Sequence, residues 1–252
     1  MNCLKIILIC GALVTLAACS SAPTPATPAA AASAASGTTP NSAPTEESGP
    51  VTLKITSPSS GEVVKTTDVP LTFVLTHYHI EPNGQHIHVI LDNEPYQPCY
   101  TTAEPFILKD VKPGAHTVRA FPSRAWHESI KEPTAFATVS FYVEKKEGTP
   151  PVSLKKPLLT YSRPKGKYEG EKANKILFDF FLTNVDLGEN GYKVKYSLDD
   201  QKPQIISDWK PSYFENLPDG KHKLVVELVD AKGRPVKGNK FNRTEREFEV
   251  TK

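Results

Sequence analysis

The pattern of apolar and polar positions changes at residue 51. From there to the C-terminus, short runs rich in Val, Ile, Phe, Leu and Tyr are separated by Pro, Gly and Asn at intervals of about ten residues. No stretch keeps the 3.6-residue period of a long helix. Short strands with regularly spaced turn signals are typical of a β-sandwich, and we therefore expect an all-β fold.

An internal repeat divides this region. Residues 71–93 and 178–200 align without a gap at an offset of 107 residues, and Gly114-Ala115-His116 corresponds to Gly220-Lys221-His222. The identical pairs in the first alignment are Phe73/Phe180, Leu75/Leu182, Thr76/Thr183, Asn83/Asn190, Gly84/Gly191, Leu91/Leu198 and Asp92/Asp199. Two copies are too few for a solenoid, so each copy must close its own core. We predict a duplicated domain, with domain 1 at residues 51–146 and domain 2 at residues 153–252.

The N-terminus has the pattern of a targeting segment. Lys5 precedes the apolar stretch 6–18, which has the length of a signal-peptide core and is too short to span a bilayer. Leu16-Ala17-Ala18-Cys19 resembles the lipobox of bacterial lipoproteins. The resemblance implies a signal peptide at residues 1–18 and acyl chains such as palmitate on Cys19, which anchor the chain to a membrane. Ser20 then favours the outer membrane. The alternative is an ordinary secretory signal with a chance cysteine.

Residues 19–50 follow as the acylated cysteine and a linker. Residues 20–50 are nearly all Ala, Pro, Ser and Thr, a composition that buries little surface and predicts a disordered tether. Cys3 and Cys10 would leave with the signal peptide, so Cys99 is the one thiol expected in the folded part. An intrachain disulfide is therefore excluded there, and we expect Cys99 to be buried.

Two corresponding strings suggest the kind of sandwich. DVKPGAHTVRAF (110–121) and NLPDGKHKLVVELVDAKGRPV (216–236) each resemble the E–F turn and F strand of bacterial immunoglobulin-like domains, in the group that includes fibronectin type III modules. The resemblance covers residues 51–252 and implies two tandem sandwiches. It implies no particular function, because these modules serve many. His116 and His222, at equivalent places, are expected to bond back to the corner as structural residues.

Five other histidines lie in domain 1, namely His77, His79, His86, His88 and His127. The apolar residues at 87, 89 and 91 match apolar positions of the second copy, so residues 86 and 88 should face outward. The second copy has Asn184, Asp186, Lys193 and Lys195 in place of the first four, so the fold does not require histidine there. We expect a bulge near residues 76–77 and a hairpin that sets 77–79 opposite 86–88, within chelating distance. The loop at 122–134 should lie at the same end.

Three interpretations of this cluster stay open. The first is a divalent-metal site for zinc, copper(II) or nickel at His77, His79, His86, His88 and His127. The second is a ligand-binding end where Arg124, Trp126 and Glu128 contact a glycan, peptide or envelope polymer. The third is a set of solvated histidines that gain charge below about pH 6.5.

Composition and motif spacing argue against other classes. The net charge is +2, from 30 Lys and Arg against 28 Asp and Glu, so no strongly basic nucleic-acid surface is expected. His127-Glu128 begins like an HExxH zinc motif, but Lys131 stands where the second histidine is needed. The match to SxxK at residues 153–156 has no partner motif. P-loop, dinucleotide and GxSxG motifs are absent from the sequence.

We therefore expect a non-enzymatic cell-envelope lipoprotein whose binding surface lies on domain 1. The alternative is a structural or adhesion module that binds an envelope protein or glycan. A metal-dependent hydrolase built on His77, His79 and His86 ranks lowest, since three imidazoles and a water can form a catalytic zinc site.

Overall fold

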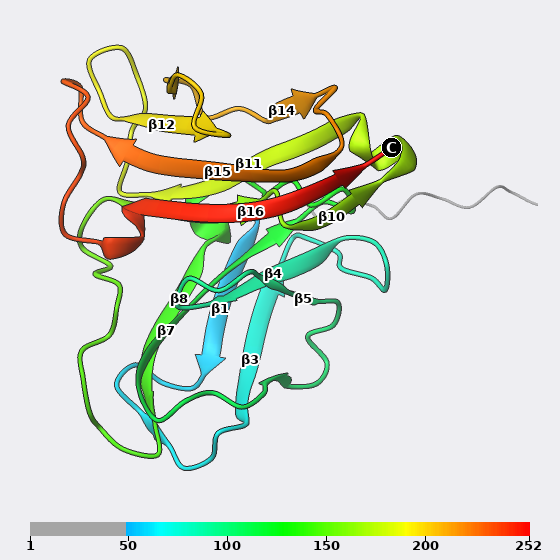
Figure 1. Cartoon of the computed structure of the whole chain (residues 1–252). Coiled ribbons are helices and arrows are strands. Elements are labelled where there is room, and N and C mark those ends of the chain that lie inside the picture. Colours follow the sequence, from blue (N-terminus) through cyan, green and yellow to red (C-terminus); the bar gives the residue numbers. More distant parts are fainter. Residues whose placement is uncertain (1–48) are drawn as a thin grey trace, which may run out of the picture. The chain divides into compact units, whose positions relative to one another are not determined.

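The computed structural model describes residues 49–252, and the predicted signal peptide, Cys19 and most of the linker lie outside the described residues. In this range the chain is all-β and has two sandwich-like halves (Figure 1). The fold class predicted from the sequence is confirmed. The three helical segments in this range are single 3₁₀ turns, and none is long and apolar enough to cross a membrane.

The first half follows the apolar runs of the first copy. Its elements are β1 (Thr52–Ser57), β2 (Val63–Val64), β3 (Val69–Thr76), β4 (His86–Leu91), β5 (Gln97–Cys99), β6 (Phe106–Leu108), β7 (Gly114–Ser123), the 3₁₀ turn η1 (Pro133–Ala135) and β8 (Ala137–Val143).

The second half repeats that series. Its elements are β9 (Leu158–Arg163), β10 (Gly166–Glu169), the 3₁₀ turn η2 (Gly170–Ala173), β11 (Lys175–Thr183), β12 (Lys193–Leu198), β13 (Gln204–Ile206), β14 (Ser212–Glu215), β15 (Gly220–Val229), the 3₁₀ turn η3 (Lys240–Asn242) and β16 (Arg243–Thr251).

Both halves have the same sheet topology. A three-stranded sheet, β1-β3-β6 or β9-β11-β14, packs against a five-stranded one. The five-stranded sheets run β2-β8-β7-β4-β5 and β10-β16-β15-β12-β13, and each begins with a parallel pair. The sequence repeat coincides with this topology, because β4 and β12 begin and end at aligned residues, as do β7 and β15. The exact domain boundaries remain a prediction.

Each half has its own core between its two sheets. Ile87 and Val89 of β4 are fully buried in the first core, together with residues of β7, β8 and β3. Val194 of β12 takes the corresponding place in the second core. The phase predicted for β4 is therefore correct, since its odd positions face the core. Cys99 is also buried in the first core, as expected.

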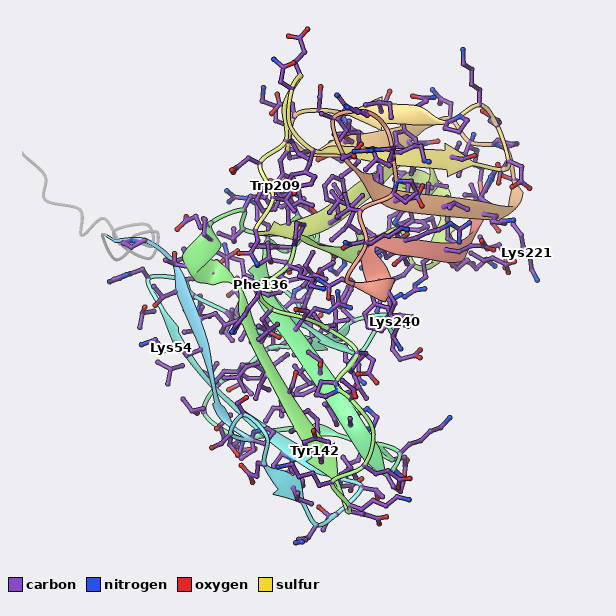
Figure 2. The ribbon with its side chains drawn as sticks, turned by 90° about the vertical axis from the view of Figure 1, so that its left-hand side faces the viewer. Lys54, Phe136, Tyr142, Trp209, Lys221 and Lys240 are labelled. Carbon is purple, nitrogen blue, oxygen red and sulfur yellow. The ribbon has the colours of Figure 1, made fainter. Side chains whose placement is uncertain are left out.

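A third apolar cluster joins the two halves. It contains Ile90, Tyr96 and Phe121 from the first half and Phe181 from the second. The side chains of Phe136 and Trp209, both labelled in Figure 2, pack against it. Buried polar contacts surround this cluster. Arg119 Nη1 donates to Thr160 Oγ1 at 2.9 Å, and Lys131 Nζ lies 2.7 Å from Asp179 Oδ1. The outer faces of β4 and β7 are consequently covered by protein.

The hairpin expected between residues 77–79 and 86–88 is wrong. Strand β3 ends at Thr76 in the three-stranded sheet, whereas β4 begins at His86 in the five-stranded sheet. In place of the expected bulge, the strand terminates, and His77 takes the left-handed conformation with φ 59°. Asn184 does the same at φ 55°, so this exit from the strand is a shared feature of both copies. The chain crosses between sheets here, as sandwich connections do.

Candidate metal centre

The structure brings together three of the five histidines singled out by the sequence. His86 and His88 project from the same face of β4, and His127 comes from the loop after β7. One ligand nitrogen from each lies within 4.8 Å of the others, and in residues 49–252 this is the group of His, Cys, Asp or Glu side chains that could hold a metal ion. His86 Nε2 lies 3.1 Å from His88 Nε2 and 3.1 Å from His127 Nδ1.

These spacings suit a shared ion. Two nitrogens bound to one zinc or copper at about 2.0–2.1 Å lie roughly 2.9–3.4 Å apart, for bond angles between a right angle and the tetrahedral value. The two 3.1 Å contacts of His86 fall inside that range. The donor set of imidazole nitrogens is one that zinc, copper and nickel prefer. The residues present therefore fit such an ion.

Hydrogen bonds behind the cluster fix the ring orientations. His86 Nδ1 lies 2.8 Å from Gly84 O, and because a carbonyl oxygen only accepts, this nitrogen donates. The Nε2 of neutral His86 is then left with its lone pair toward the cluster. His88 Nδ1 lies 3.0 Å from Ser162 Oγ of strand β9, which leaves His88 Nε2 toward the same point. Such outer contacts hold imidazole ligands in place in metal sites.

The loop that carries His127 is a tight turn. Arg124 N donates to Glu128 O at 2.8 Å and His127 N donates to Arg124 O at 2.8 Å. The second copy makes the same turn, with Asp230 N to Arg234 O and Gly233 N to Asp230 O, both at 2.9 Å. His127 has φ 72°, and the equivalent Gly233 has φ 77°. A histidine therefore occupies a left-handed position that the other copy gives to glycine, at a cost of about 1–2 kcal/mol.

Burial keeps the three imidazoles neutral. His86 and His88 have no exposed surface. Desolvation lowers the pKa of His86, and it lowers the pKa of His88 well below the ordinary value of 6.5. Desolvation, with the nearby charge of Arg163, lowers the pKa of His127 to about 3. Neutral imidazoles have free lone pairs at pH 7, so the interpretation of these three as solvated residues that gain charge below pH 6.5 is wrong.

The burial of His86 and His88 has a clear physical cause. The even positions of β4 do face away from the core of the first half, as predicted, but strand β9 lies beside them: Ser162 contacts His88, and Arg163 contacts Tyr96, which stacks on His88. Outward-facing positions of a sandwich are exposed only where nothing docks on the sheet. In the second copy the equivalent Lys193 and Lys195 stay partly exposed, and Lys195 Nζ pairs with Glu227 Oε2 at 2.6 Å.

Tyr96, Arg163 and Lys165 also border the cluster and were not foreseen. Tyr96 Oη lies 3.1 Å from His127 Nδ1, and the Tyr96 ring stacks on His88 with centroids 3.5 Å apart. Arg163 Nη2 donates to Tyr96 Oη, and Lys165 Nζ donates to Tyr96 O at 2.6 Å. Burial, with the charge of Arg163, lowers the pKa of Lys165 to about 8. Comparison of the two copies could have found Tyr96, because Pro203 occupies its place in the second.

His77 and His79 do not join the cluster. His77 Nδ1 contacts Pro50 O at 3.0 Å, and His79 is exposed. Both residues lie apart from His86 and His88 because β3 and β4 belong to different sheets. A site formed jointly by His77, His79 and His86, on which the hydrolase alternative depended, is therefore not assembled.

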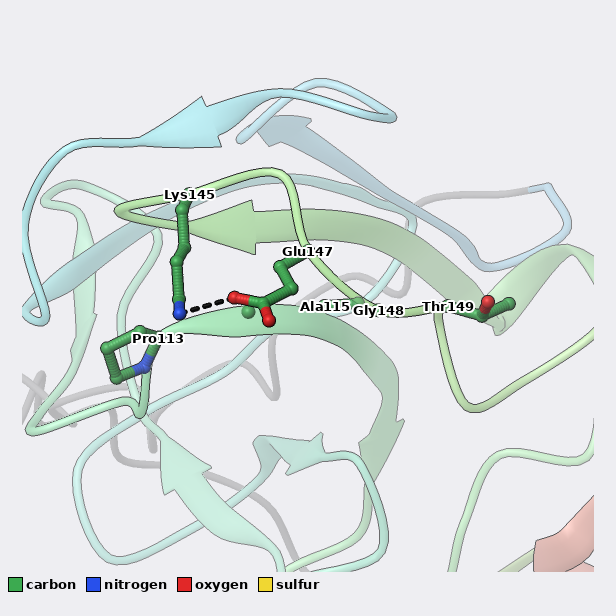
Figure 3. A pocket seen from close by; sticks show the side chains of 7 residues that line it. Pro113, Ala115, Lys145, Glu147, Gly148 and Thr149 are labelled. Carbon is green, nitrogen blue, oxygen red and sulfur yellow. Dashed lines mark ion pairs between the residues drawn. The ribbon is translucent and has the colours of Figure 1, made fainter.

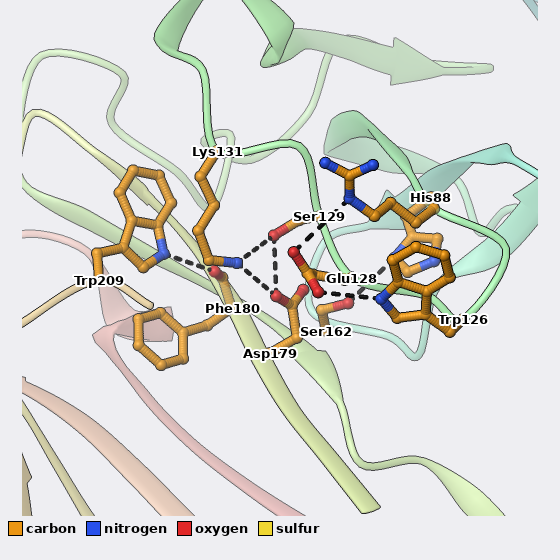
Figure 4. Close-up of polar contacts among 10 residues, drawn as sticks. His88, Trp126, Glu128, Ser129, Lys131, Ser162, Asp179, Phe180 and Trp209 are labelled. Atoms are coloured by element: carbon orange, nitrogen blue, oxygen red, sulfur yellow. Dashed lines mark hydrogen bonds and ion pairs between the residues drawn. The ribbon is translucent and has the colours of Figure 1, made fainter. Parts of the chain in front are cut away.

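Trp126 and Glu128, both labelled in Figure 4, lie with Arg124 on the same turn, apart from the three histidines, and Trp126 is the exposed member of this group. Trp126 is 57% exposed, its Nε1 donates to Glu128 Oε2 at 3.0 Å, and the Arg124 guanidinium lies 5.5 Å from the indole centroid. Figure 4 also shows the neighbouring contacts of Asp179, which accepts hydrogen bonds from Ser129 and Lys131. The turn thus exposes the Trp126 side chain, and Glu128 and Arg124 hold its indole ring in place.

His116 and His222 have the structural role predicted for them. His116 Nδ1 contacts Asp92 Oδ2 at 2.8 Å and its Nε2 contacts Lys112 O at 2.7 Å. His222 makes the same two contacts, with Asp199 Oδ2 at 2.7 Å and Pro218 O at 2.8 Å. The hydrogen bond to Asp92 raises the pKa of His116. Each histidine fastens the start of its strand to the preceding corner.

A hollow lies at the other end of β7. It has a volume of about 410 Å³ and is lined by residues 113–115, Lys145 and residues 147–149 (Figure 3). Lys145 and Glu147 form an ion pair across it, and both side chains are largely exposed. An exposed pair of this kind contributes little energy and offers a ligand no buried polar group. The hollow is also far along β7 from the histidines, since His86 pairs with Ser123 and Gly114 pairs with Val143.

The chain matches no family model and no curated protein. It is similar in structure to fibronectin(III)-like modules of Clostridium thermocellum CbhA, at 13% identity over 79% of this chain and 94% of that chain, with a TM-score of 0.29. It is also similar to the Bacteroides ovatus glucan-utilization protein SGBP-B in complex with a mixed-linkage heptasaccharide, at 10% identity over 78% and 68%, with a TM-score of 0.23.

Red sea bream transglutaminase is a further structural neighbour, at 11% identity over 80% of this chain and 31% of that chain, with a TM-score of 0.24. These neighbours include sandwich modules, a glycan complex and an enzyme. Likeness of fold therefore leaves the function to be argued from the side chains.

Proposed function

We propose that this chain is a non-enzymatic binding module whose first half holds one zinc or copper(II) ion at His86, His88 and His127. The observation that carries the proposal is the convergence of three imidazole nitrogens within 4.8 Å, two of them on fully buried side chains. Buried polar groups need partners, and a cation would satisfy three lone pairs at once. Nickel, the third ion considered, takes the same donors but prefers more ligands in a plane.

The hydrogen-bond partners of His86 also support this proposal. With its hydrogen on Nδ1, His86 has a single lone pair to offer, and two neighbouring nitrogens lie 3.1 Å from it. One of these can donate to it, while the other contact gains nothing from a second donor. The positive φ of His127 adds a cost that a glycine would avoid. Residues held in costly conformations cluster at functional sites.

The closed character of the site supports binding over catalysis. A catalytic zinc site keeps one coordination position open to water and substrate. Here His86 and His88 are fully buried, and Tyr96 and Tyr100 lie over His86, with ring centroids 6.4 and 4.9 Å from it. A buried ion would stabilise the first half and fix the loop after β7. The closed setting of the three histidines therefore favours a structural or storage role.

Calorimetric titration of the full chain with zinc and with copper(II) at pH 7.5 tests this proposal. We expect one ion per chain, and we expect His86→Gln combined with His127→Gly to abolish binding. The matched control is His77→Asn with His79→Asp, which takes the residues of the second copy and should bind as the parent does. Binding lost in the control and kept in the cluster variant would overturn the proposal.

We also propose that Cys19 anchors the module to a cell envelope, with the outer membrane favoured by Ser20. The support is the sequence pattern Leu16-Ala17-Ala18-Cys19 after an apolar segment. Labelling of cells with a palmitate analogue should mark the parent chain and leave Cys19→Ser unlabelled. Equal labelling of both chains would contradict the proposal.

One observation favours glycan binding as a second function. Trp126 is far more exposed than most large apolar side chains, while its N–H group and one side of its ring are held by Glu128 and Arg124. A fixed indole flanked by charged hydrogen-bonding groups suits a sugar ring. Titration with soluble β-glucan oligosaccharides, followed by tryptophan fluorescence, should show saturation that Trp126→Ala removes and Trp209→Phe keeps. No change with the parent chain would exclude these glycans.

A further inference from the structure

The three histidines lie among positive charges. Arg163 and Lys165 act on the cluster through their charges, and Lys172 acts on His127. In the part of the chain that the structure describes, the group of converging ligands contains three imidazoles and no carboxylate. The cost of moving an ion from water into a protein interior rises with the square of its charge, and nearby cations add to that cost. The setting therefore favours a monovalent ion over a divalent one.

The site also offers few ligands. Structural zinc sites have four protein ligands, and catalytic zinc sites have three and a water. Here three nitrogens converge, and no further His, Cys, Asp or Glu side chain of residues 49–252 joins them. Tyr96 Oη lies 3.1 Å from His127 Nδ1, but burial raises the pKa of Tyr96, so this oxygen stays protonated and neutral. An ion that three ligands satisfy fits this set better than zinc does.

Aromatic rings close the site to water. The ring of Tyr96 stacks on His88 with centroids 3.5 Å apart, and the centroid of Phe121 lies 5.4 Å from that of His88. The ring of Tyr100 lies 4.9 Å from that of His86, and neither His86 nor His88 has exposed surface. A divalent ion would lose its strongly bound water on entry and find no anionic ligand in exchange. A monovalent ion loses far less hydration energy.

Copper(I) is the monovalent ion that suits these donors. Imidazole is a ligand for copper, and copper(I) has a filled d shell and is stable with two or three ligands. Alkali-metal ions prefer oxygen. Sulfur, which copper(I) also favours, is supplied in residues 49–252 by Cys99, and Cys99 is buried in the first core with the odd positions of β4. Its thiol therefore faces away from the histidines, which leaves the imidazoles as the ligands.

We propose that the site of His86, His88 and His127 binds copper(I) through three nitrogens, and binds it more tightly than zinc or copper(II). The inference rests on the proposed function of the same histidines and names the ion that they favour. Copper enters and leaves as copper(I), so no electron is transferred and no bond within the protein breaks. The divalent ions compete for the same three nitrogens and bind more weakly.

Lys165 contributes to this preference from the second half. Its Nζ donates to Tyr96 O at 2.6 Å and lies 3.8 Å from the centroid of the Tyr96 ring. Lys165→Gln removes the charge and keeps an N–H group for that oxygen. Lys167→Gln is the matched control, because it also removes one positive charge. Lys167 is not among the charges that act on the three histidines, and its Nζ lies 2.8 Å from Glu169 Oε1.

The test is an anaerobic titration of the purified full chain with copper(I), supplied as its acetonitrile complex in competition with bicinchoninate, beside a zinc titration. We expect one copper(I) per chain, bound at least about tenfold more tightly than zinc. Lys165→Gln should lower the ratio of the two affinities at least about threefold, and Lys167→Gln should keep the ratio of the parent chain.

Two measurements need no variant. X-ray absorption of the copper(I)-loaded parent chain should show three nitrogen ligands and no fourth ligand. The midpoint potential of the bound copper should lie above that of the aqueous couple, because tighter binding of copper(I) than of copper(II) raises it.

The outcomes separate the two proposals. Zinc bound as tightly as copper(I), a midpoint potential below that of the aqueous couple, or a fourth ligand on copper(I) would each overturn the preference and leave the three-histidine site standing. An unchanged ratio in Lys165→Gln would overturn the electrostatic reason for it. Copper(I) binding that survives in His86→Gln with His127→Gly would place the ion elsewhere. No binding of copper(I), copper(II) or zinc by the parent chain would overturn the proposed function itself, and the inference with it.

Discussion

Strands β4 and β12 occupy the same place in two halves of equal topology, and their outer faces differ completely. In β12 that face has Lys193 and Lys195, which stay partly exposed. In β4 the aligned positions are His86 and His88, which are fully buried. A duplicated sheet can therefore keep its core while one of its outer faces becomes buried, once another part of the chain covers that face.

The turns that follow β7 and β15 show the same contrast. Residues 124–128 and 230–234 close by the same pair of hydrogen bonds. The left-handed position is Gly233 in one turn and His127 in the other. The second copy shows what the fold prefers there, and the first departs from it at the residue that reaches the histidines of β4. The corners, in contrast, are alike, since His116 and His222 make equivalent contacts.

The ion pair between Lys131 of the first half and Asp179 of the second should contribute most to the free energy of unfolding. Lys131→Met should destabilise the chain by about 3–5 kcal/mol, because it leaves Asp179 as a fully buried carboxylate with no cation. Burial already raises the pKa of Asp179. Denaturant unfolding monitored by Trp209 fluorescence measures the change.

A double variant tests the reason for that loss. Lys131→Met with Asp179→Leu removes both charges and should recover most of the stability. A double variant as unstable as Lys131→Met alone would show that the ion pair is not the cause.

His127→Gly should separate function from stability. The substitution puts glycine where the second copy has it, so the free energy of unfolding without metal should stay level or rise by about 1 kcal/mol. The same change removes one of three ligands, so metal affinity should fall at least about tenfold. Thermal unfolding with and without zinc measures both quantities.

The reciprocal change in the second half is the control. Gly233→His should lower stability by about 1–2 kcal/mol and create no metal site, since Lys193 and Lys195 stand where the partner histidines would be. A loss of stability in His127→Gly would contradict the view that histidine is tolerated there for its function.

The contact between Asp92 and His116 should contribute less to stability, and its contribution should depend on pH. Because Asp92 raises the pKa of His116 in the fold, the pair stabilises the protein fully below the unfolded value of about 6.5. That contribution is lost as the pH rises through the folded pKa of His116. Asp92→Asn should therefore cost about 1–2 kcal/mol at pH 5.5 and less at pH 9. Unfolding curves at several pH values test this, and a cost that grows with pH would contradict it.

The smallest effect is expected at His79, which lies outside the cluster. His79→Asp takes the residue of the second copy at an exposed position, so stability should change by less than about 0.5 kcal/mol and metal affinity should stay as it is. A titration that loses the bound ion in this variant would return His79 to the site.

The sequence was sufficient for the fold and for part of the site. Alternation in β4 and the repeat predicted which of its residues enter the core, and both Ile87 and Val89 do. The loop order of a sandwich predicted that His127 lies near His86, and their nitrogens are 3.1 Å apart. These predictions are correct because they depend on the alternation of residues within one strand and on the order of the strands, and both can be read from the sequence.

The remaining features depend on pairing between distant segments. Period two tells which side of a strand a residue occupies, yet it does not tell whether that side meets water or β9. The burial of His86 and His88 therefore escaped prediction. The pairing of residues 77–79 with 86–88 failed because their proximity in sequence hid a change of sheet. Tyr96, Arg163 and Lys165 lie beside the cluster only after the halves dock.

The most direct test is a crystal structure of the chain grown with zinc or copper(II), with the ion located by anomalous scattering. The prediction is one peak about 2.0–2.2 Å from His86 Nε2, His88 Nε2 and His127 Nδ1. A peak at His77 or His79, or no peak between these three nitrogens in fully metal-loaded protein, would contradict the assignment of the site to β4 and the loop after β7.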